Sequence, residues 1–162
     1  MIADPRTSCL KELIADITFA TLTTRGPDGT LRSRPMVNQE MAKGGPLWFF
    51  TGSDTYKASD IRNDPHVNVG YTDAVAQRCI SVNGTARIIN DRRKMRQLWR
   101  PAYARWLPLG IDDPDMALLE VEINHVSSWY TGSTRNGSTW AGHTHEETTA
   151  VGCPDHEAMV FR

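Results

Sequence analysis

Short runs of strand-forming residues, separated by strong turn signals, constrain the fold of this chain more than any other feature. The runs are rich in β-branched and aromatic residues and are bounded by Gly, Pro, Asn or Asp. The expected strands are 19–24, 31–38, 47–51, 66–71, 78–89, 117–123 and 126–130. Six or seven short strands with few helices indicate an antiparallel sheet that closes, or nearly closes, into a barrel. The predicted class is therefore mainly β, of the α+β type, with a few flanking helices.

Turn and bulge signals set the connections between these strands. The segment 25–29, Arg-Gly-Pro-Asp-Gly, is a strong turn because proline presets φ and the glycines accept positive φ. It predicts a hairpin between the strands at 19–24 and 31–38. Gly44-Gly45-Pro46 predicts the next turn. Gly84, inside the longest expected strand, indicates a bulge or bend.

Three helices are expected around the sheet. The first follows an N-cap at Thr7 or Ser8, the second begins after an N-cap at Asp54 or Thr55, and the third begins after an N-cap at Asp91 and kinks or ends at Pro101. Apolar residues recur at helical spacing in each. The positions expected to face the core are Leu10, Leu13, Ile14 and Ile17, then Ala58 and Ile61, then Met95, Leu98, Trp99 and Ala102.

Length and charge exclude several classes of protein. The 162 residues predict one domain, and 18 Lys and Arg against 19 Asp and Glu give a net charge of -1. We therefore expect neither a nucleic-acid partner nor a membrane partner. No signal peptide or transmembrane run is expected, and three distant cysteines (Cys9, Cys79 and Cys153) argue against a disulfide scaffold. Together these features predict a cytoplasmic protein.

The composition changes after residue 130. Residues 1–130 are expected to form the folded domain, and 131–162 a polar C-terminal tail that is partly disordered or folds over a partner subunit. The tail holds four residues of metal-ligand type, His143, His145, Cys153 and His156. Their spacing matches no common zinc finger, so no metal site is predicted.

The segment 31–57 carries the candidate binding residues. A helix that begins near Thr55 offers free N–H groups and the positive end of its dipole to an anion. Thr55 adds a hydroxyl, Lys57 a mobile charge and Arg34, from the preceding strand, a planar fork of donors. Two interpretations stay open from the residues alone. The group is either a phosphate site, or a plain helix cap beside a hairpin with exposed arginines.

A set of ordered motifs covers most of the chain, from about residue 13 to residue 129. They are Arg32-Ser33-Arg34-Pro35-Met36, Leu47-Trp48-Phe49-Phe50-Thr51 with Lys57, Val67 to Asp73, Ile80 to Ala86, Asp91-Arg92, Leu98-Trp99, Trp106 to Gly110, and Asp112 to Val121. This set resembles the general stress protein branch of the pyridoxamine 5′-phosphate oxidase-like flavoproteins. Arg32 stands where that branch commonly has histidine, and Thr55 where it commonly has serine.

The resemblance implies a split β-barrel that forms a homodimer with flavin mononucleotide (FMN) in the dimer cleft, flavin adenine dinucleotide (FAD) being an alternative. It implies that Arg34 and Lys57 contact the phosphate with help from Thr55. Backbone at Pro35 and Met36 would lie along the isoalloxazine ring. The full implied cofactor-binding set is Arg32, Ser33, Arg34, Pro35, Met36, Phe50, Thr51, Thr55, Tyr56, Lys57 and Trp129. For Trp129, a role in the core or at the dimer interface is an equal alternative.

The expected function is a flavin-binding, stress-related protein, which is either a redox enzyme acting on an unidentified small substrate or a flavin-binding protein without turnover. No known catalytic constellation stands out, so no catalytic residue is predicted and any chemistry would be the flavin's. One alternative is an oxidase of the pyridoxamine phosphate type, which the departures at Gln39, Tyr56 and Cys79 argue against. A second is a non-flavin dimer that binds nucleic acid through the basic helical segment 92–105, although a solvated helix face is the simpler interpretation.

Overall fold

The computed structural model describes residues 5–39, 45–130 and 159–160 of the chain. One antiparallel sheet dominates it, with the strand order β2-β1-β4-β5-β6-β3 and β7 paired to β6. The strands are β1 (Phe19–Arg25), β2 (Leu31–Val37), β3 (Leu47–Gly52), β4 (His66–Asp73), β5 (Arg78–Ile89), β6 (Met116–Tyr130) and β7 (Met159–Val160). The predicted mainly β class is confirmed.

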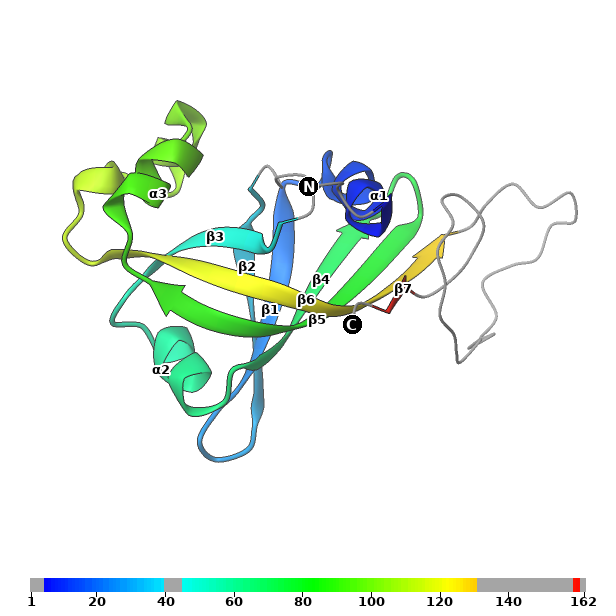
Figure 1. Cartoon of the computed structure of the whole chain (residues 1–162), viewed down its shortest axis with the longest axis horizontal. Coiled ribbons are helices and arrows are strands. Elements are labelled where there is room, and N and C mark those ends of the chain that lie inside the picture. The colour runs from blue at the N-terminus through cyan, green and yellow to red at the C-terminus, as the bar shows by residue number, and fades with distance from the viewer. Residues whose placement is uncertain (1–4, 40–44, 131–158, 161–162) are drawn as a thin grey trace, which may run out of the picture.

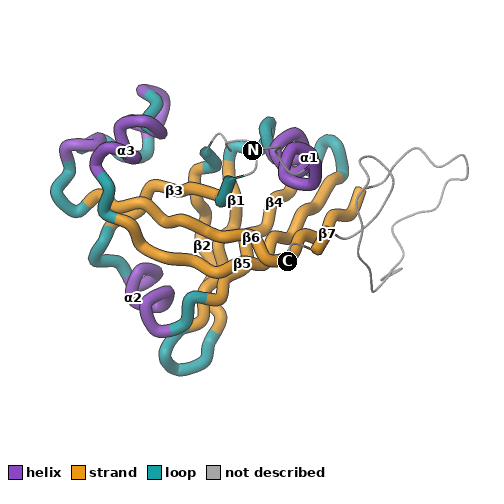
Figure 2. Tube along the Cα trace, in the orientation of Figure 1, coloured by secondary structure: helices purple, strands orange, loops and turns teal. Residues whose placement is uncertain are grey.

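The sheet curls into a split barrel (Figure 1). β2 and β3 lie at opposite ends of the strand order, yet the curl brings them near each other without pairing. Helices α1 (Pro5–Ile14), α2 (Tyr56–Asn63) and α3 (Arg92–Leu98) lie around the periphery of the strands (Figure 2). Two short 3₁₀ helices, η1 (Pro101–Arg105) and η2 (Gly110–Asp112), follow α3. The predicted end of the third helix near Pro101 is confirmed, since α3 stops at Leu98.

The β1–β2 hairpin forms as its turn signal predicts. Thr24 lies opposite Arg32, and Leu22 lies opposite Arg34. Gly29 adopts φ of 81° in the turn, a conformation that residues with a Cβ rarely take. Because side chains alternate along a strand, the hairpin has one face toward the barrel interior and one face outward.

The strands predicted separately at 117–123 and 126–130 are one strand, and that prediction is wrong. β6 runs through the region without a break because an irregularity absorbs the extra residue: Gly84 pairs with Ile123, whereas Asn83 pairs with His125. The bulge predicted at Gly84 is thus confirmed. A Cβ at Gly84 would lie 2.4 Å from the Glu122 carbonyl oxygen, so only glycine permits this approach.

Two apolar clusters fill the part of the chain that the structure describes. The larger cluster lies inside the barrel and joins inward side chains of the strands with α1 and α2, among them Leu10, Leu22, Phe49, Ile61 and Val82. The smaller cluster lies between β3, β6 and α3, and contains Phe50, Met95, Met116 and Leu118. Leu10, Ile14, Ala58, Ile61 and Met95 are buried, which confirms their predicted place in the core. Ala102 is exposed, so its predicted place in the core is wrong.

Several expectations fall on residues outside the description. The tail cluster of His143, His145, Cys153 and His156 lies there, and so does most of the predicted tail at 131–162. Within the described residues, no helix combines the length and the apolar character needed to cross a bilayer.

Candidate functional site

Strand β2 presents its two arginines on the inner side of the hairpin. Arg32 and Arg34 alternate with outward-facing Ser33 and Pro35, and they share their face with buried Met36. Met36 belongs to the barrel core, so the same face changes from apolar to cationic within a few residues. The arginines therefore lie at the edge of the core, where their stems are covered and their guanidinium groups remain accessible.

The first turn of α2 lies beside these arginines. Thr55 is its N-cap, which settles the choice between Asp54 and Thr55 left open by the sequence. The Thr55 hydroxyl accepts a hydrogen bond from Ala58 N (3.3 Å) and donates to the Gly52 carbonyl (3.1 Å). The backbone N–H groups of Tyr56 and Lys57, at the first two helical positions, have no acceptor within the helix and remain available to an anion.

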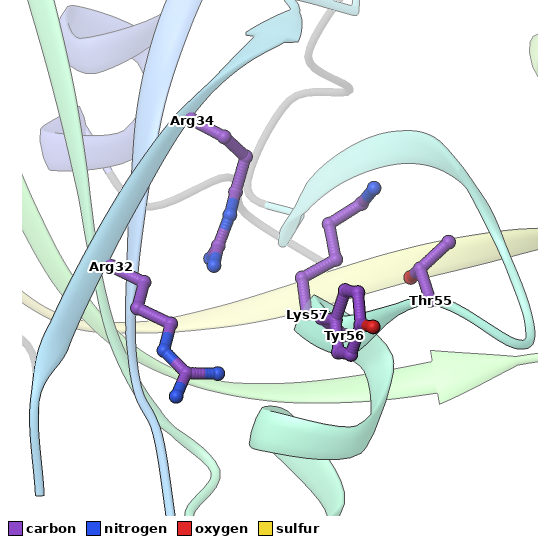
Figure 3. A pocket seen from close by; sticks show the side chains of 5 residues that line it. All are labelled: Arg32, Arg34, Thr55, Tyr56 and Lys57. Atoms are coloured by element: carbon purple, nitrogen blue, oxygen red, sulfur yellow. The ribbon is translucent and has the colours of Figure 1, made fainter.

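A pocket of about 440 Å³ lies between β2 and α2, lined by Arg32, Arg34, Thr55, Tyr56 and Lys57. Figure 3 shows the two arginine side chains leaving β2 toward α2, and the other three rising from the first turn of the helix. All five residues belong to the predicted cofactor-binding set. The fold thus brings together two groups that are about twenty residues apart in the sequence, although their contacts with a ligand stay a prediction.

A buried carboxylate stands behind the arginines. Asp60 is only 2% exposed, and its two oxygens face Arg32 Nη1 (3.5 Å) and Arg34 Nη2 (3.6 Å). It also accepts a hydrogen bond from the Thr24 hydroxyl (2.8 Å), and Arg34 Nη1 donates to that same hydroxyl (2.6 Å). Arg32 has a second partner in Asp28, at 3.3 Å. Arg32 is therefore largely neutralised, whereas Arg34 shares one carboxylate.

Thr24 and Asp60 are not among the residues predicted from the sequence. At both positions, however, the sequence pattern indicates a buried polar residue. Thr24 continues the inward register of Ala20 and Leu22 in β1, and a polar residue at a core position is unusual. Asp60 lies three residues after Lys57, on the same helix face, and next to inward Ile61. A charged residue at such a position needs a partner, and the arginines of β2 supply it.

Lys57 differs from the two arginines because, among the described residues, no ion pair or hydrogen bond of its ammonium group is found. Partial burial, and then the charge of Arg34, lower its pKa from the ordinary value. Burial also lowers the pKa of Arg34, and Asp60 opposes that effect. The pocket thus holds a desolvated ammonium beside a half-neutralised guanidinium, an arrangement that an anion would stabilise.

Other members of the predicted set lie outside this pocket. The side chains of Ser33 and Pro35 are on the outer face of β2, and Met36 is in the core. Phe50 packs edge-on against Trp99, with ring centroids 5.4 Å apart, in the smaller cluster. Thr51 is buried. Trp129 pairs through its backbone with Cys79, and its side chain lies outside the description.

The three positions that depart from the oxidases lie in different environments. Gln39 is buried, and its Nε2 donates to the carbonyl of Val37 (3.2 Å). Tyr56 is 86% exposed at the mouth of the pocket. Cys79 is a free thiol on β5. Within the described part of the chain, no group of three or more His, Cys, Asp or Glu is placed to hold a metal ion.

The basic segment after β5 is mostly engaged in packing the chain against itself. Arg92 donates to the carbonyls of Ile111, Asp113 and Pro114. Cation–π contacts hold Lys94 over Trp48 (4.9 Å) and Arg105 over Trp106 (5.8 Å). Arg100 donates to the carbonyls of Gln97 and Trp99. This arrangement favours a structural role for the segment over a nucleic-acid surface.

Comparison with known proteins gives consistent matches. A family model described as pyridoxamine 5'-phosphate oxidase like matches residues 6–148. The Neurospora crassa protein bli-3 is 29% identical over 143 residues, 82% of this chain and 68% of that protein. General stress protein 26 of Bacillus subtilis is 33% identical over 79 residues, 47% of this chain and 56% of that protein. A solved structure, the general stress FMN/FAD binding protein of Xanthomonas citri, is 26% identical with a TM-score of 0.66, and the match covers 90% of this chain and 97% of that chain.

Proposed function

The chain belongs to the pyridoxamine 5'-phosphate oxidase-like family, and we propose that it is a flavin-binding protein whose pocket between β2 and α2 holds the phosphate of FMN. One observation carries this proposal: five residues of the predicted set line a single pocket at a helix N-terminus, and the described residues provide no counter-ion for the Lys57 ammonium. The Xanthomonas citri relative, described as FMN/FAD binding, supports the same cofactor class.

The donor set fits a phosphate monoester. Lys57 supplies a charge that no described residue neutralises, Arg34 has N–H groups left over from its contacts with Thr24 and Asp60, and the first turn of α2 supplies two backbone N–H groups. Their combined charge exceeds that of the single carboxylate behind them. A dianionic phosphate would replace the missing counter-charge, and charge-assisted hydrogen bonds would hold it. Arg32, already paired with Asp28 and Asp60, would contribute mainly to the positive electrostatic potential of the pocket.

The bound flavin would supply hydride or electron transfer, chemistry that no side chain provides. The protein's part in it would be binding and orientation. Tyr56, exposed at the pocket mouth, would cover the ribityl chain and would not bind the phosphate. We propose a redox function with a small-molecule substrate. That substrate would be a molecule that fits the open part of the site.

We also propose that the protein is a homodimer with the flavin at the dimer cleft. The outer face of the sheet carries two rows of uncharged residues across five strands: Ser33, Thr23, Asn68, Asn83 and His125, and Pro35, Thr21, Gly70, Ser81 and Ser127. These described rows contain no Lys, Arg, Asp or Glu. Side chains hydrogen-bond along the face, as between Asn68 and Ser81 (2.6 Å). Such an uncharged surface, whose polar side chains partly satisfy one another, suits contact with a second copy.

The visible absorption spectrum of the purified protein tests the proposal. The protein is mixed with FMN and then passed through a gel-filtration column that removes unbound flavin. Flavin bands that stay with the protein, in about one equivalent per chain, are the expected result. A colourless protein after the column would overturn the proposed function.

A further inference from the structure

Asp60 and Thr24 lie behind the pocket and do not line it. Asp60 comes from the middle of α2 and is buried, yet three donors converge on its carboxylate: the Thr24 hydroxyl, Arg34 and Arg32. A carboxylate this deep is costly without partners, so its burial is tied to the two arginines. Thr24 is buried as well, at 1% exposed, on the strand that pairs with β2.

The Thr24 hydroxyl has one proton, and the structure gives that proton one destination. Asp60 Oδ2 can only accept, so the hydroxyl donates to it (2.8 Å). The lone pairs of Thr24 Oγ1 are then directed at Arg34 Nη1, which donates at 2.6 Å. Arg34 is thus held at both terminal nitrogens, by Thr24 at one and by Asp60 at the other. We name this arrangement the Asp60–Thr24–Arg34 relay.

We propose that Asp60 and Thr24 are positioning residues that fix the Arg34 fork toward the phosphate of the ligand. This inference rests on the proposed flavin function and deepens it. Arg34 carries the same charge as Lys57 across a small pocket, and the two would repel each other when no anion is bound. The relay holds Arg34 in place against that repulsion. A fork that is fixed in advance loses less conformational entropy when the phosphate arrives.

Binding of FMN and of riboflavin, followed by quenching of flavin fluorescence, separates positioning from simple stability. Riboflavin shares the ring and the ribityl chain but lacks the phosphate. Thr24→Val removes the hydroxyl and keeps the shape, Thr24→Ser keeps the hydroxyl, and Thr85→Val is the matched control. Thr85 also accepts a side-chain hydrogen bond, from Asn124 (3.0 Å), and it lies on β5, which β1 and β4 separate from β2 in the sheet.

We expect Thr24→Val to weaken FMN binding about tenfold, the loss that follows from removing one hydrogen bond to a charged group. Riboflavin binding stays at the parent level, and Thr24→Ser and Thr85→Val bind both flavins as the parent does. Should Thr24→Val fail to fold, Asp60→Asn tests the relay from its other end, at about 0.5 M salt so that the change in net charge is screened. The Asp60→Asn variant is expected to weaken the binding of FMN and to leave the binding of riboflavin unchanged.

Two results would overturn the inference while leaving the proposed function intact. In one, a folded Thr24→Val or Asp60→Asn variant binds FMN as tightly as the parent. In the other, the variant loses FMN and riboflavin affinity to the same extent, which would assign the relay a purely structural role. A parent protein that binds neither flavin would overturn the proposed function, and the inference with it.

Discussion

At the scale of single residues, the cations of the pocket are not equivalent. Arg32 faces two carboxylates, Arg34 shares one, and no counter-ion of Lys57 is found among the described residues. A ligand anion gains most from the charge that is least neutralised in the free protein. This ranking of the three cations, and not their number, predicts which substitution lowers the affinity for FMN most.

Lys57→Ala should weaken FMN binding by about 1.5–3 kcal/mol, the range for a hydrogen bond to a charged group. Arg34→Ala should have a similar effect. Arg32→Ala should have a smaller effect, because the Arg32 guanidinium already forms ion pairs with Asp28 and Asp60. Calorimetric titration with FMN measures all three. Lys94→Ala, which removes a lysine that lies over Trp48, is the control. An Arg32→Ala effect larger than that of Lys57→Ala would contradict the ranking.

Lys57 also predicts how binding depends on pH. Its pKa is lowered by burial and by Arg34, and a bound phosphate would raise it again. Binding then takes up protons on the alkaline side, so FMN affinity falls as pH rises through the lowered pKa of Lys57. A second fall is expected below about pH 6, where the phosphate becomes a monoanion. Lys57→Arg, which does not titrate in this range, should keep the acid limb and lose the alkaline one.

The same shift affects stability with the opposite sign. In the free protein the pKa of Lys57 lies below its unfolded value of 10.5, so the unfolded chain binds the proton more readily. The free energy of unfolding should therefore rise with pH between the folded and unfolded pKa values. Denaturant unfolding of the parent and of Lys57→Met, measured across this alkaline range, tests the slope. An equal slope in both proteins would assign it to other groups.

At the scale of elements, the bulge between β5 and β6 sets the path of the longest hairpin. A Cβ at Gly84 would meet the Glu122 carbonyl oxygen at 2.4 Å and Val121 Cγ1 at 2.6 Å. Gly84→Ala should therefore lower the free energy of unfolding by about 2–3 kcal/mol, as overpacking does. Gly70→Ala is the matched control in β4, because its Cβ would meet only the Thr21 carbonyl oxygen, at 3.9 Å. Equal denaturant midpoints for the two variants would contradict this explanation of Gly84.

Most elements of the fold could be predicted from local patterns. The Arg-Gly-Pro-Asp-Gly turn set the first hairpin, and Thr55 and Asp91 cap the helices at the predicted positions. The continuity of β6 could not be predicted, because Asn124 and His125 break the apolar alternation while the backbone continues through the bulge. Local periodicity gives no information about a register shift that the opposite strand accommodates.

The site, like the fold, has features that the sequence predicts and features that depend on the tertiary structure. The pocket-lining residues come from two consecutive motifs, so the sequence could place them near one another. Asp60 and Thr24 contact the arginines only because the sheet curls and α2 packs against it. Phe50 packs in the cluster with Trp99 and is not among the residues that line the pocket, so its contact with the flavin stays a prediction. Which side of a strand faces a ligand depends on the tertiary arrangement, and alternation alone leaves it open.

At the scale of the whole molecule, the uncharged outer face of the sheet predicts how the protein assembles. A lysine in the centre of this face should prevent contact between two copies, because a buried charge without a partner is costly. Ser81→Lys is therefore expected to raise the dimer dissociation constant by at least about tenfold and to weaken flavin binding with it. Val75→Lys, at a position 97% exposed in the β4–β5 turn, is the control. Sedimentation measures both, and a parent protein that is monomeric at all concentrations would contradict the proposed dimer.

The proposed phosphate site predicts that the protein binds FMN more tightly than riboflavin, which lacks the phosphate. Calorimetric titration of the parent protein with FMN and with riboflavin, under identical buffer conditions, isolates the contribution of the phosphate. Contacts from Lys57, Arg34 and the first turn of α2 predict that FMN binds at least about a hundredfold more tightly. Equal affinities for the two flavins would show that the cationic pocket does not hold the phosphate, and would contradict the proposed site.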